Sequence, residues 1–462
     1  MPASKPSCIV IGAGLAGLTA ALRLAERGWK VDIFEAFNFF GGRVFTHQFE
    51  QAPNLNCELG AEWIGDDHDH MKALCEQFKL KTQPHRYSSA FPVGATQTAA
   101  PFLRAGAWPF RAKERRLRKF LKKFKGFDEH QQKQLDRYDW WTWLETQMGF
   151  KQEDLLKRDL MDSTDFGETI RLTPAFVAAA EYAGSNRFDE MDKKVIGGNH
   201  RLPEKMKAKI LAKGGRFHLG KRVIRIVQKN LTVSVTADTL RWQRHRHRPP
   251  TPKWVKPKTK CRADFCICTI PARALSSIKW NPPLPDEHVE AANQLQYCRI
   301  AKTAVLYKTR FWEHGKYKPS GGGYSWFTDG VSDFCFDATQ KQRGDKRGII
   351  CSYAIGDKAD DLANAEPSEL MKWITQDIAR ASGLDPEPLY DLAIDIEQQP
   401  WQQNPFTQGA YAYYRSGQWF TVHQTLQRSH LRVHFAGEHL DEDWQGFMEG
   451  AVRTGEAAAA RI

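Results

Sequence analysis

Three glycines near the N-terminus have the spacing of a phosphate-binding turn. Gly12, Gly14 and Gly17 form the pattern G-x-G-x-x-G directly after the apolar run 8–11. In such a turn the first glycine permits a sharp bend, and the second lets the backbone approach a pyrophosphate. The third lets a helix pack closely on a strand. The pattern therefore predicts a dinucleotide site in which phosphate binds free N–H groups at a helix N-terminus.

The residues that follow supply the elements that such a turn requires. Apolar residues recur at helical spacing from 15 to 27, and Gly28 is placed as the C-cap. A second apolar run, 31–34, ends in Glu35, which lies 18 residues after Gly17. An acid at this distance accepts hydrogen bonds from a ribose diol and repels a 2′-phosphate. Strand, turn, helix, strand and acid predict the first βαβ unit of a Rossmann-type sheet.

A second glycine turn with an arginine, Gly41-Gly42-Arg43, follows Glu35 closely. An arginine here offers a forked set of donors to the same pyrophosphate. The order GxGxxG, Glu, GGR resembles the flavin-containing amine oxidases, the family of monoamine, polyamine and L-amino-acid oxidases. The resemblance implies FAD as the cofactor.

Length and composition set the class of protein. The chain has 462 residues, enough for two domains, and 41% of them are apolar. It lacks an uncharged apolar run of about 20 residues, and its first strand leaves no room for a signal peptide. Nine cysteines without metal-ligand spacing predict reduced thiols, buried at Cys266 and Cys268, and no metal site. We therefore expect a cytoplasmic protein without a membrane anchor.

The net charge of +13 is concentrated in two stretches. Residues 111–125 predict a surface helix whose apolar stripe packs inward; a membrane-surface or polyanion contact is the alternative. Residues 239–262 contain nine Lys or Arg and no acid. Their core, 242–260, is rich in Pro, Arg and His and predicts an exposed, disordered loop that interrupts a hairpin. Nucleic acid is disfavoured as a partner, because no reading module surrounds this loop.

The expected fold class is α/β plus α+β, a Rossmann-type FAD-binding domain of the amine-oxidase type with an inserted mixed substrate domain. Residues 1–80, 196–285 and 400–462 are assigned to the FAD-binding domain. Residues 81–195, mostly helical, and 286–399 are assigned to the substrate domain. The oligomeric state stays open, a homodimer included.

A lysine in the middle of the chain carries the second part of the resemblance. Lys302 lies in the alternating run 300–308, which is followed by Phe311-Trp312. This segment is similar to the one in which amine oxidases place a lysine that hydrogen-bonds a water beside flavin N5 and assists the reaction with oxygen. A fixed cation there would favour developing negative charge.

Two aromatic residues near the C-terminus complete the catalytic set that the resemblance implies. Tyr411 and Phe447 correspond to the walls of an aromatic cage around the amine. Ala410 stands where monoamine oxidases have the flavin-linking cysteine, which implies non-covalent FAD. Trp63 stands where many L-amino-acid oxidases have an arginine that binds the substrate carboxylate, so a carboxylate clamp is missing at this position.

The resemblance also implies a cofactor-binding set that spans the chain. A strand at Val223 would meet the adenine, the segment around Gly60 would pass beside the flavin ring, and Glu438 would contact the ribityl–phosphate region. The full set is Gly12, Gly14, Leu15, Ala16, Gly17, Glu35, Ala36, Gly42, Arg43, Gly60, Ala61, Glu62, Trp63, Val223, Trp401, Glu438, Gly446, Phe447, Met448, Glu449 and Ala451.

These residues imply an FAD-dependent oxidase of a small amine. The amine gives a hydride equivalent to flavin N5, the imine hydrolyses to an aldehyde or keto acid plus ammonia, and O2 becomes H2O2. Three alternatives stay open. The substrate is an L-amino acid; or it is a polyamine, with Glu62 facing its distal amine; or the chain is a non-catalytic flavoprotein scaffold that binds polyanions through its two basic stretches.

Overall fold

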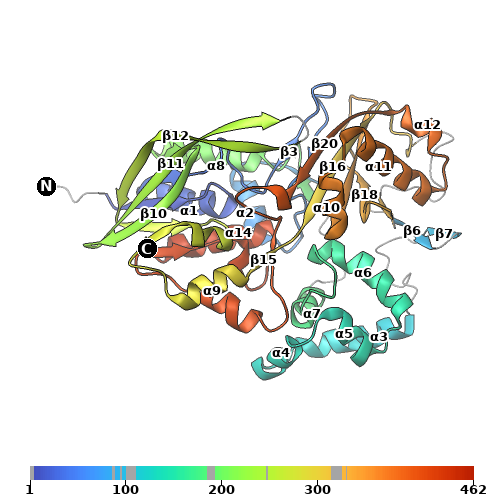
Figure 1. Ribbon diagram of the computed structural model, residues 1–462, viewed down its shortest axis with the longest axis horizontal. Helices are drawn as coiled ribbons and strands as arrows, with labels where there is room; N and C mark the ends of the chain where they lie inside the picture. The colour runs from blue at the N-terminus through green and yellow to red at the C-terminus, as the bar shows by residue number, and fades with distance from the viewer. Residues whose placement is uncertain are drawn as a thin grey trace.

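The computed structural model describes residues 5–85, 89–93, 96–99, 111–184, 193–245, 248–313, 325–328 and 330–462. Three groups of elements are visible in Figure 1. A parallel sheet with helices α1 and α14 lies on the left, a larger mixed sheet with α10–α12 on the right, and helices α3–α7 below it. The ranges that build the sheets alternate along the chain, and the limits assigned to the two domains stay a prediction.

The first sheet is parallel and holds the predicted βαβ unit. Its order is β22-β13-β1-β2-β9, and every neighbouring pair runs parallel. Strand interiors are buried because helices and a second sheet cover the faces, which is why their sequences read as continuous apolar runs. The strands are β1 (Ser7–Ile11), β2 (Lys30–Phe34), β9 (Arg216–His218), β13 (Phe265–Cys268) and β22 (Val433–Phe435).

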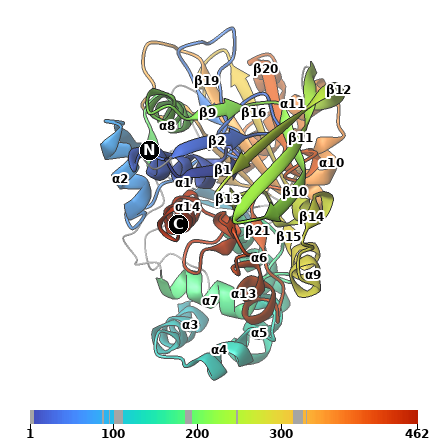
Figure 2. The same cartoon turned by 90° about the vertical axis from the view of Figure 1, so that its left-hand side faces the viewer.

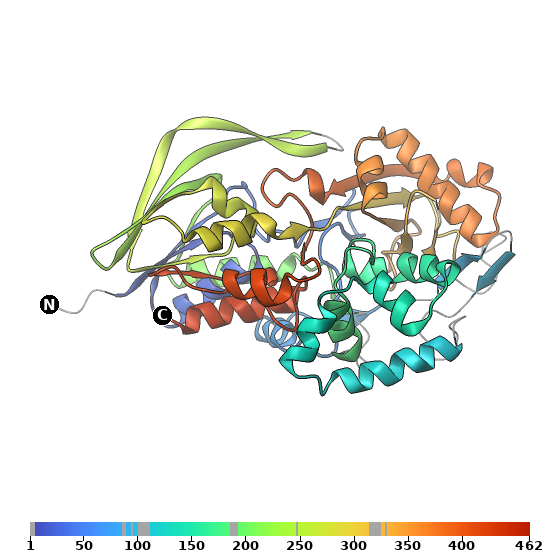
Figure 3. The same cartoon turned by 60° about the horizontal axis from the view of Figure 1, so that its bottom comes forward.

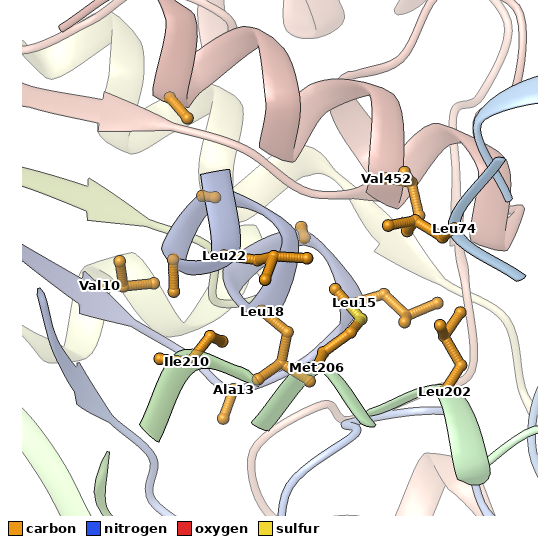
Figure 4. Close-up of a cluster of buried hydrophobic side chains, with 14 of the residues drawn as sticks. Val10, Ala13, Leu15, Leu18, Leu22, Leu74, Leu202, Met206, Ile210 and Val452 are labelled. Carbon is orange, nitrogen blue, oxygen red and sulfur yellow. The ribbon is translucent and has the colours of Figure 1, made fainter. Parts of the chain in front are cut away.

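Helix α1 (Leu15–Glu26) is buried between neighbours from distant parts of the chain. Figure 4 shows Leu15, Leu18 and Leu22 of α1 between side chains of α8 (Arg201–Ala212) and those of α2 (Asp69–Gln77) and α14 (Met448–Ala460). Gly455 of α14 is needed for this packing, because a Cβ there would lie 2.4 Å from the Ala16 carbonyl oxygen. Helix α14, near the end of the chain, thus packs on and stabilises the first turn of helix α1.

The stretch predicted as a disordered loop is instead a long hairpin. Strand β11 (Thr232–His245) pairs antiparallel with β12 (Arg248–Ala263), in the sheet β12-β11-β10-β14 with β10 (Lys221–Lys229) and β14 (Lys279–Asn281). The prolines were misleading because β12 is an edge strand, where a missing N–H breaks no ladder. Figure 3 shows the hairpin running along one side of the molecule.

The larger sheet has the order β20-β16-β19-β18-β17-β6-β7. Every residue of β16 is buried, including Lys302. Three helices lie beside this sheet: α10 (Asp357–Ala363), α11 (Pro367–Ser382) and α12 (Glu387–Tyr390). Its strands are β6 (Ser89–Val93), β7 (Thr96–Ala99), β16 (Ile300–Tyr307), β17 (Ser325–Phe327), β18 (Phe334–Asp337), β19 (Gly348–Ile355) and β20 (Ala393–Pro400).

Five helices, α3 to α7, come after β6 and β7 along the chain and form a separate layer. Figure 2 shows α3, α4, α5 and α7 together at the bottom of the view. The helices are α3 (Arg111–Phe124), α4 (Glu129–Leu135), α5 (Trp140–Met148), α6 (Gln152–Phe166) and α7 (Ala175–Gly184). Leu117 and Phe124 of α3 are buried, which confirms the inward-packing stripe, and Trp140, Trp141 and Trp143 are core residues.

Shorter elements connect these layers. Among them are β3 (Thr46–His47), β4 (Cys57–Glu58), β5 (Thr82–Pro84), β8 (Lys193–Val195), β15 (Gln296–Tyr297), β21 (Ala412–Tyr413), α9 (Asp286–Gln294) and α13 (Gln424–Leu426). All nine cysteines are free thiols, and Cys266 and Cys268 are buried as predicted. In the described part of the chain, no helix is long and apolar enough to cross a membrane.

Candidate functional site

One cavity of about 1080 Å³ connects the glycine turn, the helical layer and the larger sheet. Its walls contain every residue predicted for catalysis or cofactor binding except Gly17 and Glu449. These residues are distant along the chain, and the fold brings them together. Helices α1 and α14 pack on each other at one end of the cavity, and β16 lies at the other end. The cavity is therefore continuous from the predicted dinucleotide end to Lys302, Tyr411 and Phe447.

The glycine turn has the shape that a pyrophosphate requires. Gly12 has a φ of +104° and Gly42 a φ of +61°, the left-handed region that glycine adopts readily. A Cβ on Gly42 would lie 3.1 Å from the Gly14 Cα, so the two turns meet backbone to backbone. Helix α1 begins at Leu15 without a side-chain cap, which leaves its first N–H groups available to an anion. This arrangement fits a dinucleotide.

Glu35 lies at the carboxyl end of β2, as the spacing predicted. Its Oε2 accepts from the Ala13 N–H at 2.7 Å, and its Oε1 accepts from the Phe37 N–H at 2.9 Å. Burial raises the pKa of the Glu35 carboxyl, although these N–H groups oppose the shift. The carboxyl is fixed at the edge of the cavity, where a ribose diol could reach it.

Arg43 and Glu438 join three distant segments beside the turn. The Arg43 Nη1 donates to Glu438 Oε1 at 2.7 Å and to the Ala410 carbonyl oxygen. Glu438 also accepts from the Gly446 N–H at 3.0 Å and from the Ala412 N–H at 3.3 Å. Because one guanidinium nitrogen makes these contacts, the remaining donors of Arg43 can serve a pyrophosphate in the cavity.

Lys302 is buried in a cluster of charges. Its Nζ lies 2.8 Å from Glu62 Oε2 and 3.1 Å from the Gly60 carbonyl oxygen. Lys194 of β8 lies 3.4 Å from the other oxygen of Glu62, and all three residues are buried. Burial would lower the pKa of Lys302, but the charge and hydrogen bond of Glu62 raise it above its usual range. Lys302 therefore remains an ammonium group.

Glu62 lines the cavity, as the polyamine alternative requires. Its two oxygens already face two lysines, which compete with the distal amine of a substrate for this carboxylate. Two ammonium groups share this one carboxylate. Glu58 lies near them, and burial raises its pKa to about 7.

Aromatic rings surround the part of the cavity next to Lys302. The Tyr411 hydroxyl lies 3.2 Å from the Tyr353 hydroxyl, and Gly446 approaches the Tyr411 ring so closely that a Cβ would contact it at 3.3 Å. Trp401 is anchored by a 2.8 Å hydrogen bond from its Nε1 to the Leu59 carbonyl oxygen. Phe327, Phe334, Phe336, Trp63 and Phe447 complete these walls. These rings offer an apolar surface against which a small apolar amine can pack.

Gly17 and Glu449 lie behind the cavity. A Cβ on Gly17 would lie 2.0 Å from the Gly12 carbonyl oxygen, so this glycine serves the close packing of helix and turn. The Glu449 carboxylate accepts from the N–H groups of His70 and Met71 and caps α2. Its side chain is outside the cavity lining and caps a helix, a role that the motif does not reveal.

Two carboxyl groups in the cavity wall are not evident from the sequence motifs. Asp165 of α6 faces the cavity beside Tyr411, whose hydroxyl donates to the Asp165 carbonyl oxygen at 3.3 Å. Burial, together with Asp162, raises the pKa of Asp165 to about 7. Burial and Asp165 raise the pKa of Glu181 of α7 to about 8. The sequence does contain a signal for these groups. Charged residues at 158, 162 and 165 recur at helical spacing beside the buried stripe of α6, which indicates a charged helix face next to the core.

Comparisons with known proteins agree with this geometry. Residues 15–462 match the family described as flavin containing amine oxidoreductase. The L-amino acid dehydrogenase of Synechocystis sp. is 25% identical, over 100% of this chain and 95% of that protein. Amine oxidase [flavin-containing] B of Sus scrofa is 22% identical, over 99% of this chain and 86% of that protein.

A solved structure shows the same fold. Putrescine oxidase bound to putrescine superimposes with a TM-score of 0.82 over 99% of both chains, at 21% identity. The fold, the continuous cavity and the family match agree, and the chain belongs to the flavin-containing amine oxidoreductases.

Proposed function

We propose that this protein is an oxidase of a small amine that uses FAD bound without a covalent link. One observation carries the proposal: the cavity that holds the dinucleotide features is continuous with the one that holds Lys302 and the aromatic walls. Among the described residues that line it there is no cysteine, and Ala410 occupies the position where the family's linking cysteine is expected. Both facts support a flavin that is bound without a covalent link.

FAD bound in the cavity would supply the two-electron oxidation of the carbon that bears the amine, with O2 as the final electron acceptor and H2O2 as its product. The chain binds and orients the reactants. Tyr411 and Phe447 hold the uncharged amine between apolar surfaces, and exclusion of water protects the reacting centre. The imine leaves and is hydrolysed to a carbonyl compound and ammonia.

Lys302 contributes charge to the half-reaction with oxygen. Its ammonium group stays protonated because Glu62 opposes the effect of burial. A fixed cation in a dry cavity stabilises negative charge that develops near it. This role needs no proton transfer from Lys302 itself.

The primary substrate class is a monoamine. A second candidate, a diamine or polyamine, is favoured by the Asp165 and Glu181 carboxyl groups in the cavity wall, which could bind a distal ammonium group. An L-amino acid would need a cation for its carboxylate. Arg158 lines the cavity, but it is paired with Asp162 at 2.7 Å, and Trp63 occupies the position of the family's arginine.

A peroxide-coupled screen of the purified protein separates these substrate classes. We expect H2O2 from monoamines such as benzylamine. If Asp165 and Glu181 bind the distal ammonium group of the substrate, diamines should be turned over faster than monoamines. Peroxide from L-amino acids alone would contradict the monoamine assignment. No peroxide from any of the three classes would contradict the proposed oxidase.

A further inference from the structure

Arg222 lies in the wall of the cavity between two aromatic rings. It precedes Val223 on β10, at the same end of the cavity as Glu35. Its guanidinium carbon is 5.3 Å from the centre of the Trp254 ring and 5.4 Å from the centre of the Phe406 ring. Trp254 belongs to β12, so this contact comes from the basic hairpin.

The same hairpin contacts the loop that follows Glu35. Trp242 of β11 donates from its Nε1 to the Ala36 carbonyl oxygen at 2.9 Å and stacks on the Phe37 ring at 4.4 Å. Phe406 meets both Trp242, at 5.5 Å, and Phe37, at 5.3 Å. The two strands of the hairpin thus connect the loop after β2 with Arg222.

We infer that the β11–β12 hairpin is an arm that retains the cofactor by holding Arg222 against its adenosine half. The inference rests on the proposed binding of FAD. A guanidinium group stacks on aromatic faces, adenine included, and attracts a diphosphate. Trp254 and Phe406 limit the positions that Arg222 can take, so less freedom is lost when the nucleotide binds.

The charge of the hairpin acts in the same direction. Residues 239–262 contain nine Lys or Arg and no acid, and FAD is an anion. The positive potential of this stretch raises the rate at which an anionic nucleotide reaches this end of the cavity, whereas the rate of its release depends on the contact with Arg222. The structure thus gives a role to the basic strands that composition alone assigned to a disordered loop.

The test is the rate at which FAD leaves the holoenzyme after dilution, followed by the rise in flavin fluorescence. We expect Arg222→Gln to accelerate release about tenfold, the equivalent of one desolvated cation–π contact. Trp254→Ala should accelerate it less, and should add nothing in the Arg222→Gln background, because the tryptophan acts through Arg222. Thermal unfolding of each variant checks that the fold is intact.

Lys258→Gln is the matched control. Lys258 lies on the same strand as Trp254 and pairs with Asp238 at 3.8 Å on the exposed side of the hairpin. We expect its rate of FAD release and its oxidase activity to equal those of the wild type. Release from Lys258→Gln as fast as from Arg222→Gln would overturn the inference in favour of general electrostatic attraction.

The inference would also be overturned if Arg222→Gln and Trp254→Ala both released FAD as slowly as the wild type. If Arg222→Gln does not fold, Trp254→Ala decides alone, because that ring is 50% exposed and can be removed without a cavity. A wild-type protein that takes up no FAD would instead contradict the proposed function, so the two failures are distinguishable.

Discussion

The Nζ of Lys302 lies 2.8 Å from Oε2 of Glu62, although 240 residues separate the two along the chain. Both side chains are buried. An ammonium group in this position would lose its proton more easily without a partner, because burial disfavours charge. Lys194 lies 3.4 Å from the other oxygen of Glu62, so one carboxylate is shared by two lysines. The ion pair therefore maintains a cation beside the expected flavin.

Lys302→Met should slow the reoxidation of reduced flavin by O2 by about a hundredfold, the usual effect of losing one preorganised electrostatic group. The reduction of the flavin by amine should change much less. Stopped-flow absorbance measures both half-reactions separately. Lys308→Met is the control, because Lys308 follows the same strand but is exposed. Wild-type reoxidation in Lys302→Met would remove the role given to this lysine.

Glu62→Gln should change the pH dependence of the same step. In the wild type, Glu62 raises the pKa of Lys302, so the rate of reoxidation should stay constant until the pH exceeds the usual pKa of a lysine. Without the carboxylate, burial dominates and lowers the pKa of Lys302. The loss of rate should then begin at lower pH. Identical pH profiles for the two proteins would disprove the charge balance described above.

Two glycine substitutions should separate cofactor binding from folding. Gly14→Ala should fold normally, because its backbone has a φ of −75° and the nearest atom to a new Cβ is 3.9 Å away. That methyl group would occupy the approach of the pyrophosphate, so we expect the affinity for FAD to fall by about a hundredfold. Fluorescence titration of the apoprotein measures this affinity.

Gly17→Ala should act in the opposite way. Its Cβ would lie 2.0 Å from the Gly12 carbonyl oxygen, so the helix must move away from the turn. We expect a loss of about 1–3 kcal/mol in the free energy of unfolding, typical of overpacking. Denaturation of the apoprotein in urea measures it. If Gly14→Ala proved the less stable of the two, the geometry assigned to the turn would be wrong.

Glu181→Gln should make the apoprotein more stable at high pH. The pKa of Glu181 is about 8 in the folded protein, against an ordinary value of 4.5, so the folded state is penalised as the pH rises through this interval. Below pH 4.5 both states are protonated and the variant should match the wild type. At pH 9 its melting temperature should be a few degrees higher.

Glu153→Gln, an exposed glutamate of α6, is the control for that measurement and should show no such dependence on pH. A difference between Glu181→Gln and the wild type that is equal at pH 4 and pH 9 would contradict the raised pKa. The same variant tests the diamine alternative, because loss of a carboxyl group that binds an ammonium group raises KM for diamines and leaves KM for monoamines unchanged.

Local patterns predicted the first strand, glycine turn, helix and second strand well. The turn at Gly12, the acid at Glu35 and the helix between them are adjacent in sequence, so spacing determines their geometry. Lys194 was not predictable, because its contact with Glu62 depends on how β8 is placed by the rest of the fold. The fold, not the motif, also decides that Glu449 caps α2. Composition was misleading for the hairpin, where an edge strand tolerates prolines.

The most direct test of the central claim is the absorption spectrum of the purified protein before and after anaerobic addition of an amine. We predict a yellow protein whose flavin is bleached by the amine and recovers on admission of O2 with release of H2O2. Acid precipitation should leave FAD in the supernatant, because the cofactor is not covalently bound. A colourless protein that takes up no FAD, or a flavin that no amine reduces, would contradict the account.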